Sequence, residues 1–513
     1  MGKDATVNYS MYLCVVMATV RGNDSPQQTT ADAHLNDVLE PALLRLRQLL
    51  QDFVTQPANV SATFDLERQI QAVLRELGRA GVEWAMNHVE PDQSDLLPPH
   101  VEFEVGVYTR IKRKTPQSVA TVFGKIDFWR YGYRPTQKTG DATIFPLAQQ
   151  LGIIAGATPA LAERAAYYQA EAGATQRRTL QRLKQEHGVC WGVKKLREVT
   201  TRISSAMAEE RPAVQVEKLL QLLEQAWLST GKHKPVLSVG RDGITVVLPI
   251  RKGTICEVAS TGTVAVLDRR GKRLGTVYLA YMPESKQGTM SQELTRLVDE
   301  VLRRWERPSP RLCYVTDAGD NETKYYESVL RRMKHPRTGE RLEWVRVVDY
   351  YHASQRLWTM AEALFGSGSS AQGWVRRMKK LLVKPNGIRR VLNSAAVLRS
   401  RCELKGKAKK EFGKAYDYLR DRTRFMRYAA YKRVGVPRGS GVTEAACKTI
   451  YTQRLKLSGM RFTKAGGQTI LNLRVILLSD VWSEAYRRVM KNINNVKVPT
   501  YDLPRVKVLA KAA

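Results

Sequence analysis

Apolar runs of strand length recur between residues 235 and 348, and their order limits the folds that this chain can adopt. The pattern predicts three strands, a helix, a strand, a helix and a strand, over Pro235–Pro249, Thr254–Leu267, Leu274–Tyr281, Ser291–Arg304, Arg311–Thr316, Glu322–Met333 and Trp344–Val348. Turn residues such as Arg270-Gly271 separate the strands. A sheet that alternates with helices indicates an α/β core. This order of elements is the one expected of a ribonuclease-H-like core.

The segments on either side of this core are predicted to be mainly helical. Leucines recur at helical spacing from Leu39 to Leu77, so residues 1–100 form an N-terminal helical region. A short strand-like pattern lies within Val119–Tyr133. Residues 158–205 predict a helix-turn-helix, with helices at Pro159–Ala172, Thr179–Glu186 and Gly192–Met207. A DNA-reading module and a helical hairpin within a bundle both fit that pattern.

The net charge points to a polyanionic partner. The 513 residues include 83 Lys and Arg against 49 Asp and Glu, which gives a formal charge of +34. Residues 1–100 carry 7 basic and 13 acidic side chains, whereas residues 375–465 carry 26 basic and 5 acidic ones, a net of +21. Nucleic acid is the first candidate for a partner that such a stretch binds. An acidic membrane surface and a solvated surface without a partner are the alternatives.

The cysteines and the apolar runs bear on location. The six cysteines, from Cys14 to Cys447, form no Cys-x-x-Cys pair and have no His at zinc spacing, so we expect no structural zinc. Scattered cysteines fit the reducing cytoplasm. The longest apolar run, Tyr12–Val20, is too short to span a membrane. Met1-Gly-Lys-Asp is a poor leader, so we expect no export signal. The basic stretch is not a single amphipathic helix with a bulky apolar face, so we expect no membrane partner.

Three carboxylates fall where a core of this kind would display functional side chains. Asp242 lies in the first strand, Asp317 ends the fourth, and Glu444 opens a helix. Carboxylates that converge across a sheet can hold Mg²⁺, a hard cation that prefers oxygen ligands. Each also has a plainer interpretation. Asp242-Gly243 is a typical turn, Asp317 or Asp320 can cap the following helix, and Glu444 suits a helix dipole.

A fourth feature is the pair Asp349 and His352, at the end of the fifth strand and the start of a helix. His352 can contact DNA or support a metal site. The alternative is a structural Asp–His hydrogen bond that fixes the strand-to-helix turn. Asp349 is the fallback acid if Asp317 is not catalytic.

Several stretches together carry a family resemblance. They are Arg241-Asp-Gly, Thr316-Asp-Ala-Gly, Asp349-Tyr-Tyr-His, Gly439-Ser-Gly-Val-Thr-Glu, Gln453-Arg-Leu-Lys-Leu-Ser-Gly-Met-Arg-Phe and Leu471-Asn-Leu-Arg. In this order the chain resembles bacterial insertion-sequence transposases of the DDE type, the ISKra-like group related to mutator-type transposases. The motifs span residues 235 to 485, about half of the chain.

The resemblance implies a catalytic and metal-binding triad of Asp242, Asp317 and Glu444, with Asp349 and His352 as a supporting pair. It also implies a helical insertion before the last acidic helix, in agreement with the separation of 127 positions from Asp317 to Glu444. The predicted regions are an N-terminal helical DNA-binding or oligomerisation region (1–100), a DNA-binding region (101–233), the first part of the core (234–352), a basic all-α insertion (353–435), the C-terminal core helices (436–490) and a basic tail (491–513).

The implied reaction is phosphoryl transfer with two Mg²⁺ ions, for which Mn²⁺ can substitute. Water cleaves the phosphodiester at a transposon end, and the freed 3′-OH attacks target DNA in line. The implied partners are double-stranded DNA, as transposon ends and as target, and further copies of the chain in a homodimer or larger assembly. The implied location is the bacterial cytoplasm, with the nucleoid.

Basic residues in and after the insertion are the candidate DNA contacts. We expect Lys and Arg to neutralise phosphates. These residues are Lys405, Lys407, Lys409, Lys410, Arg422, Arg424, Lys432, Arg433, Arg454, Lys456 and Arg461. Aromatic residues among them, from Tyr416 to Tyr431, can stack on opened bases or pack inward.

Two other functions fit the same pattern. One is a domesticated or decayed transposase that binds DNA without cutting it. The other is a ribonuclease-H-like nuclease or resolvase that cuts but never joins. Loss of cleavage on replacing Asp242 separates the first from an active enzyme, and insertion of a pre-cut 3′-OH end into a second duplex separates the second.

Overall fold

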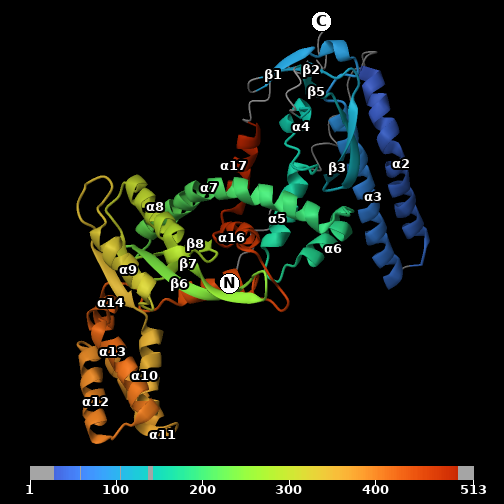
Figure 1. The fold of residues 1–513 in the computed structure, drawn as a ribbon. Helices are drawn as coiled ribbons and strands as arrows, with labels where there is room; N and C mark the ends of the chain where they lie inside the picture. The colour runs from blue at the N-terminus through green and yellow to red at the C-terminus, as the bar shows by residue number, and fades with distance from the viewer. Residues whose placement is uncertain (1–27, 58, 104–105, 137–141, 495–513) are drawn as a thin grey trace. The chain divides into compact units, whose positions relative to one another are not determined.

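The computed structural model describes residues 28–57, 59–103, 106–136 and 142–494 (Figure 1). The chain has a mixed α/β fold in two compact units. The first contains the described residues up to Leu151 together with Glu186–Val189, and the second contains Gly152–Gln185 and the described residues from Cys190 onward. The apolar run Tyr12–Val20, Cys14 and the predicted tail beyond residue 494 lie outside the described residues.

The first unit combines two long helices with short strands. Helices α2 (Gln28–Thr55) and α3 (Val60–Asn87) pack together, and Arg45 of α2 pairs with Glu76 of α3 at 3.1 Å. The helices predicted from the leucine spacing are therefore present in residues 28–87. The other elements are β1 (His100–Phe103), β2 (Gly106–Arg110), β3 (Thr115–Thr121), β4 (Gly124–Arg130), β5 (Tyr133–Pro135) and α4 (Pro146–Gln150).

The strand predicted within Val119–Tyr133 is in fact two strands. Strands β3 and β4 form an antiparallel hairpin, and the turn between them ends at Gly124, whose φ is +122°. Glycine adopts this backbone conformation without steric cost. Strands β1, β2 and β5 form a separate antiparallel sheet.

The second unit is built on a five-stranded mixed sheet in the order β10-β9-β6-β7-β8. Its strands are β6 (Val236–Pro249), β7 (Thr254–Leu267), β8 (Arg273–Tyr281), β9 (Arg311–Thr316) and β10 (Trp344–Val348). Strands β6, β7 and β8 pair antiparallel, and β6, β9 and β10 pair parallel. All five strands were predicted, with bounds that agree within one residue.

Helices cover both faces of this sheet (Figure 1). On one face α7 (Val193–Leu228), α8 (Gly288–Arg304) and α9 (Asp320–Ser328) share a core with the strands, in which Leu223, Val264 and Leu294 are fully buried. On the other face α15 (Gly441–Cys447), the π-helical turn η6 (Lys448–Thr452) and α16 (Lys464–Leu478) pack on β6, β7 and β8. Burial on both faces explains why every residue from Ala259 to Leu267 of β7 is buried, including Ser260.

Helix α7 differs from the third helix of the predicted helix-turn-helix. The first two helices are present as α5 (Pro159–Ala170) and α6 (Gln176–His187). The third continues to Leu228, and its C-terminal half buries Leu219 and Leu223 against the sheet. Helix α7 is therefore a core helix over part of its length, whereas a reading helix in a small DNA-binding module is free to enter a groove.

A basic helical segment separates β10 from α15. Its helices are α10 (Tyr350–Phe365), α11 (Ser369–Leu382), α12 (Gly387–Arg401), α13 (Gly406–Asp421) and α14 (Tyr428–Arg433), and α10 to α13 form a bundle (Figure 1). Their core includes Trp374 and Phe412 and continues to Val347 of the sheet. The aromatic side chains from Tyr416 to Tyr431 pack on this core, so they face inward. Helix α17 (Trp482–Asn494) follows α16.

Candidate active site

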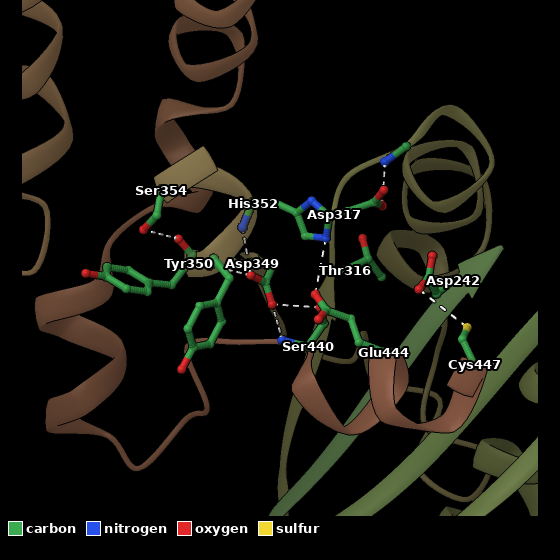
Figure 2. A network of polar contacts seen from close by, with 12 residues as sticks. Asp242, Thr316, Asp317, Asp349, Tyr350, His352, Ser354, Ser440, Glu444 and Cys447 are labelled. Carbon is green, nitrogen blue, oxygen red and sulfur yellow. Dashed lines mark hydrogen bonds and ion pairs between the residues drawn. The ribbon is translucent and has the colours of Figure 1, made fainter. Parts of the chain in front are cut away.

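Asp242 lies in β6 at the level where the neighbouring strand β9 ends. The parallel pairing of these strands ends at Gly240 with Val315. Extending that register by two residues brings Asp242 level with Asp317, the residue that follows β9. Neighbouring strands lie about 4.8 Å apart, so the two carboxylates are neighbours, as Figure 2 shows. Asp320, the rival of Asp317, is exposed at the start of α9.

The electrostatic environment of Asp242 disfavours its ionised form. Burial is the main cause that raises the pKa of its carboxyl, and the charge of Asp317 adds to it. The backbone N–H of Gly243, which donates to Oδ1 at 2.7 Å, acts in the opposite direction. Two acids that share a partly buried place repel each other, and a cation between them would remove that repulsion.

The loop that carries Asp317 is held from two sides. The Gly319 N–H donates to Asp317 Oδ1 at 2.9 Å, and Ala318 between them has a φ of +61°. From the helical segment, the Tyr418 hydroxyl donates to the backbone oxygen of Asp317, and Arg422 Nη2 donates to that of Ala318 at 3.1 Å. The helical segment therefore fixes the position of the second acid.

Helix α15 brings Glu444 to the same end of the sheet. Gly240 of β6 permits this approach, because a Cβ there would lie 2.0 Å from Thr443 Oγ1. Thr443 is also within 2.8 Å of the Thr263 hydroxyl in β7. One turn after Glu444, the Cys447 thiol donates to Asp242 Oδ2 at 3.5 Å. Residues three apart share a helix face, so Glu444 lies on the same side of α15 as Cys447, and Figure 2 shows its carboxylate turned toward His352.

Asp349 connects the first turn of α10 to the residue that precedes α15. Its carboxyl is fully buried and caps α10 by accepting from the backbone N–H groups of Tyr351 and His352. It also accepts from the backbone N–H of Ser440, and from the Ser440 hydroxyl at 2.6 Å. With four donors its oxygens are occupied, which fits a structural role better than that of a fallback metal ligand. It fixes the start of α10 beside the start of α15.

The predicted Asp349–His352 hydrogen bond is made by the backbone of His352, not by its ring. The His352 Nε2 lies 3.3 Å from Glu444 Oε1 (Figure 2). The ring therefore supports the third acid directly.

Two buried polar residues near the site were given no role by the sequence analysis, although Arg241 belongs to one of the motifs that carry the resemblance. Glu322 of α9 is 7% exposed, and burial with the charge of Asp317 raises the pKa of its carboxyl. Arg241 is fully buried beside it, donating to Ser291 Oγ at 2.9 Å and Gln287 Oε1 at 2.8 Å. The position of Glu322 in the first turn of the helix after Asp317 is the pattern that could have indicated it.

Some of the predicted DNA contacts are exposed, and others are hydrogen-bonded within the protein. The exposed ones are Lys405, Lys407, Lys409, Lys410, Arg424, Lys432, Arg433, Lys456 and Arg461. Arg422 is instead bonded to the Ala318 carbonyl. Arg454 is 1% exposed, and its Nε donates to the Gln169 backbone oxygen at 2.7 Å. The predicted DNA contact Arg454 is therefore not an exposed cation, because its guanidinium is buried against α5.

The donor chemistry suits a hard divalent cation. Asp242, Asp317 and Glu444 offer carboxylate oxygens, the ligands that Mg²⁺ prefers. No three His, Cys, Asp or Glu residues in the described part of the chain lie close enough together to hold a metal ion.

Among the described residues, no helix has both the length and the apolar character that crossing a membrane requires. Comparison of the sequence with protein-family models finds no match, and comparison with curated proteins finds none either.

Proposed function

We propose that this protein is a DDE transposase of the ISKra-like group, which cuts DNA at transposon ends and joins the 3′-OH ends to target DNA. The observation that carries the proposal is that three acids from three elements lie at the same end of the sheet. Asp242 lies level with Asp317, and Glu444 lies on α15 one turn before Cys447, whose thiol contacts Asp242. These are the three residues that the resemblance assigns to catalysis.

The sheet supports a ribonuclease-H-like core as part of this proposal. Three antiparallel strands are followed by two parallel ones, with the first strand at the centre, beside the fourth. This arrangement places Asp242 of the first strand next to Asp317 after the fourth. The long helical segment then enters between the last strand and the helix that carries Glu444.

Each site residue has a role in the proposed reaction. Asp242, Asp317 and Glu444 would hold the metal ions over the scissile phosphate, and His352 orients the Glu444 carboxylate. When bound, magnesium supplies charge neutralisation at the phosphate and activation of the attacking water or 3′-OH. Buried Asp349 keeps α15 in register with α10. Catalysis then rests on positioning and on charge, without a covalent protein intermediate.

The exposed basic residues support DNA as the substrate. Lys409, Lys410, Lys432 and Arg433 lie on the helical segment that holds the Asp317 loop through Tyr418 and Arg422. Phosphates bound by these side chains would therefore contact the same helical segment whose Tyr418 and Arg422 hydrogen-bond to the loop of Asp317. Because transposition joins two ends, we also propose that the active form is a dimer or a larger assembly.

The test of this function is Mg²⁺-dependent cleavage of DNA taken from the flanks of the gene. Asp317→Asn should abolish cleavage and keep DNA binding. Asp320→Asn, the matched control three residues away, should cut like the parent because its side chain is exposed on α9. Equal cleavage by Asp317→Asn and the parent would refute the proposal. A pre-cut end with a free 3′-OH should be inserted into a second duplex, and cutting without insertion would indicate a nuclease.

A further inference from the structure

A pocket of about 480 Å³ lies in the second unit, apart from the three acids. Its walls come from the end of α5, the start of α6, the first turns of α7, and the segment from Arg454 to Ile470. The volume is in the range of small-molecule sites, which is about 300–1,000 Å³. The reaction proposed above gives this pocket no role.

Two buried polar groups in its wall lack a partner. Arg454 Nη1 has no hydrogen-bond partner among the described residues, although the residue is only 1% exposed. The Thr200 hydroxyl, on α7, is likewise buried and unpartnered. An unsatisfied buried donor costs about 1–3 kcal/mol, so two at one pocket point to a ligand that accepts hydrogen bonds.

The charge at this place is positive. Arg454 and the nearby Arg474 donate only to carbonyl and amide oxygens, such as those of Gln169 and Thr449, and within the described residues neither has an ion pair. Burial lowers the pKa of Arg454 to about 10, and the charge of Arg474 contributes. Buried charges are usually paired. An anion in the pocket would supply the missing partner.

Further groups suited to an anion surround the opening. Arg197 of α7 and the exposed Arg461 line it. The N-terminus of α16, a helix of 15 residues, also lies there, with Thr463 as its cap and Gly466 in its first turn. Helix N-termini favour phosphate groups. Together with unpartnered Arg454, they form a site with the chemistry of a phosphate pocket.

The rest of the wall is apolar. Phe462, Met460, Leu196 and Ile470 line it, and the Arg454 guanidinium lies 5.6 Å from the centre of the Phe462 ring. An aromatic ring beside an arginine is the type of surface on which nucleic-acid bases stack. A ligand with an anionic group and a flat ring fits both halves of the pocket.

We propose that this pocket binds one unpaired nucleotide of a DNA strand, with its phosphate toward Arg454 and Arg461 and its base against Phe462. The choice of a DNA strand over a free nucleotide rests on the proposed function. Arg454 follows Glu444 by ten residues through α15 and η6, and Gly173 N–H fixes the segment by donating to Gln453 O at 2.8 Å. A nucleotide held here would therefore fix the path of a strand relative to the third acid.

The test is the binding of a short single-stranded oligonucleotide containing 2-aminopurine to the full chain, without divalent metal, by fluorescence anisotropy. Arg461→Gln and Phe462→Ala should each weaken binding about tenfold. Lys456→Gln, an exposed charge of the same loop outside the pocket, should weaken it about twofold. Thr200→Val should weaken binding while leaving the unliganded protein folded, since it replaces an unpartnered hydroxyl with a methyl group of similar size.

The competitors identify the source of the ligand. Deoxyadenosine monophosphate should displace the oligonucleotide, whereas inorganic phosphate at equal concentration should not. Equal affinity of Arg461→Gln and Lys456→Gln for the oligonucleotide would contradict the proposal that this pocket is the binding site. Tight binding of the mononucleotide that the pocket variants abolish, with unchanged oligonucleotide binding, would overturn the DNA strand as ligand. Because no cleavage is measured, absence of transposase activity would leave these results unaffected.

Discussion

His352 Nε2 lies 3.3 Å from Glu444 Oε1, and this contact joins the helix that begins the basic segment to the helix that carries the third acid. The contact depends on Asp349, which caps α10 and bonds to Ser440 just before α15. A ring that holds a ligating carboxylate acts on metal affinity and on the orientation of the ligand. Helix α10 thus contributes to the site through His352.

Replacement of His352 should weaken the site without removing it. We expect His352→Gln to lower the cleavage rate about 10- to 100-fold and to shift the Mg²⁺ dependence to higher concentration, because Glu444 loses its orienting partner. DNA binding should not change. Cleavage rates measured over a series of Mg²⁺ concentrations check this, and an unaltered Mg²⁺ dependence would show that the ring has another role.

Asp349→Ala should destabilise the protein strongly. The substitution leaves the buried Ser440 hydroxyl and several backbone N–H groups without their acceptor. We expect a loss of about 3–5 kcal/mol in the free energy of unfolding. Urea unfolding measures this loss. A change below about 1 kcal/mol would mean that Asp349 does not hold α10 and α15 together.

In the absence of metal, Asp242→Asn should stabilise the folded protein. Because the folded protein raises the pKa of this carboxyl, the folded chain binds a proton more tightly than the unfolded chain does. Ionised Asp242 therefore costs stability as the pH rises through its folded pKa. The variant, which cannot ionise, should gain in Tm relative to the parent between about pH 4 and about pH 8.

Thermal melts at several pH values test this sign. A Tm difference that shrinks as the pH rises would contradict it. Adding Mg²⁺ should raise the Tm of the parent and have little effect on Asp242→Asn, because the variant lacks one ligand.

Gly240→Ala should separate the acids without altering any of them. A Cβ at this position would meet Thr443 Oγ1 and Thr263 Oγ1, at 2.0 and 2.7 Å. Helix α15 must then move away from β6, at a cost of about 1–3 kcal/mol. Cleavage should fall sharply while DNA binding persists. Gly441→Ala on α15 itself is the control, because a Cβ there has nothing within 4 Å. Equal cleavage by the two variants would argue against close contact between α15 and β6.

Much of the sheet was predictable from the sequence because apolar residues recur within each strand and turn residues lie between several of them. Leu267 and Leu274 border such a turn, and the strands on either side end within one residue of the prediction. The β3–β4 hairpin was missed because its turn, at Val122 and Phe123, is apolar and only Gly124 marks it. The full length of α7 was missed because its first turns resemble a separate helix.

The contacts of the candidate site were less predictable than its residues. Strand order and register place Asp242 beside Asp317, and no local pattern contains that information. No local pattern indicates the hydrogen bond from the Cys447 thiol to Asp242 or the one from the Ser440 hydroxyl to Asp349 either. Arg454 was assigned to DNA by its charge, but burial depends on tertiary packing against α5.

The most direct test of the central claim is a crystal structure of the full chain with Mn²⁺ and a pre-cut DNA end. The proposal predicts anomalous density among the carboxylates of Asp242, Asp317 and Glu444, next to the terminal phosphodiester. Manganese bound elsewhere, with Glu444 turned away from both aspartates, would contradict it.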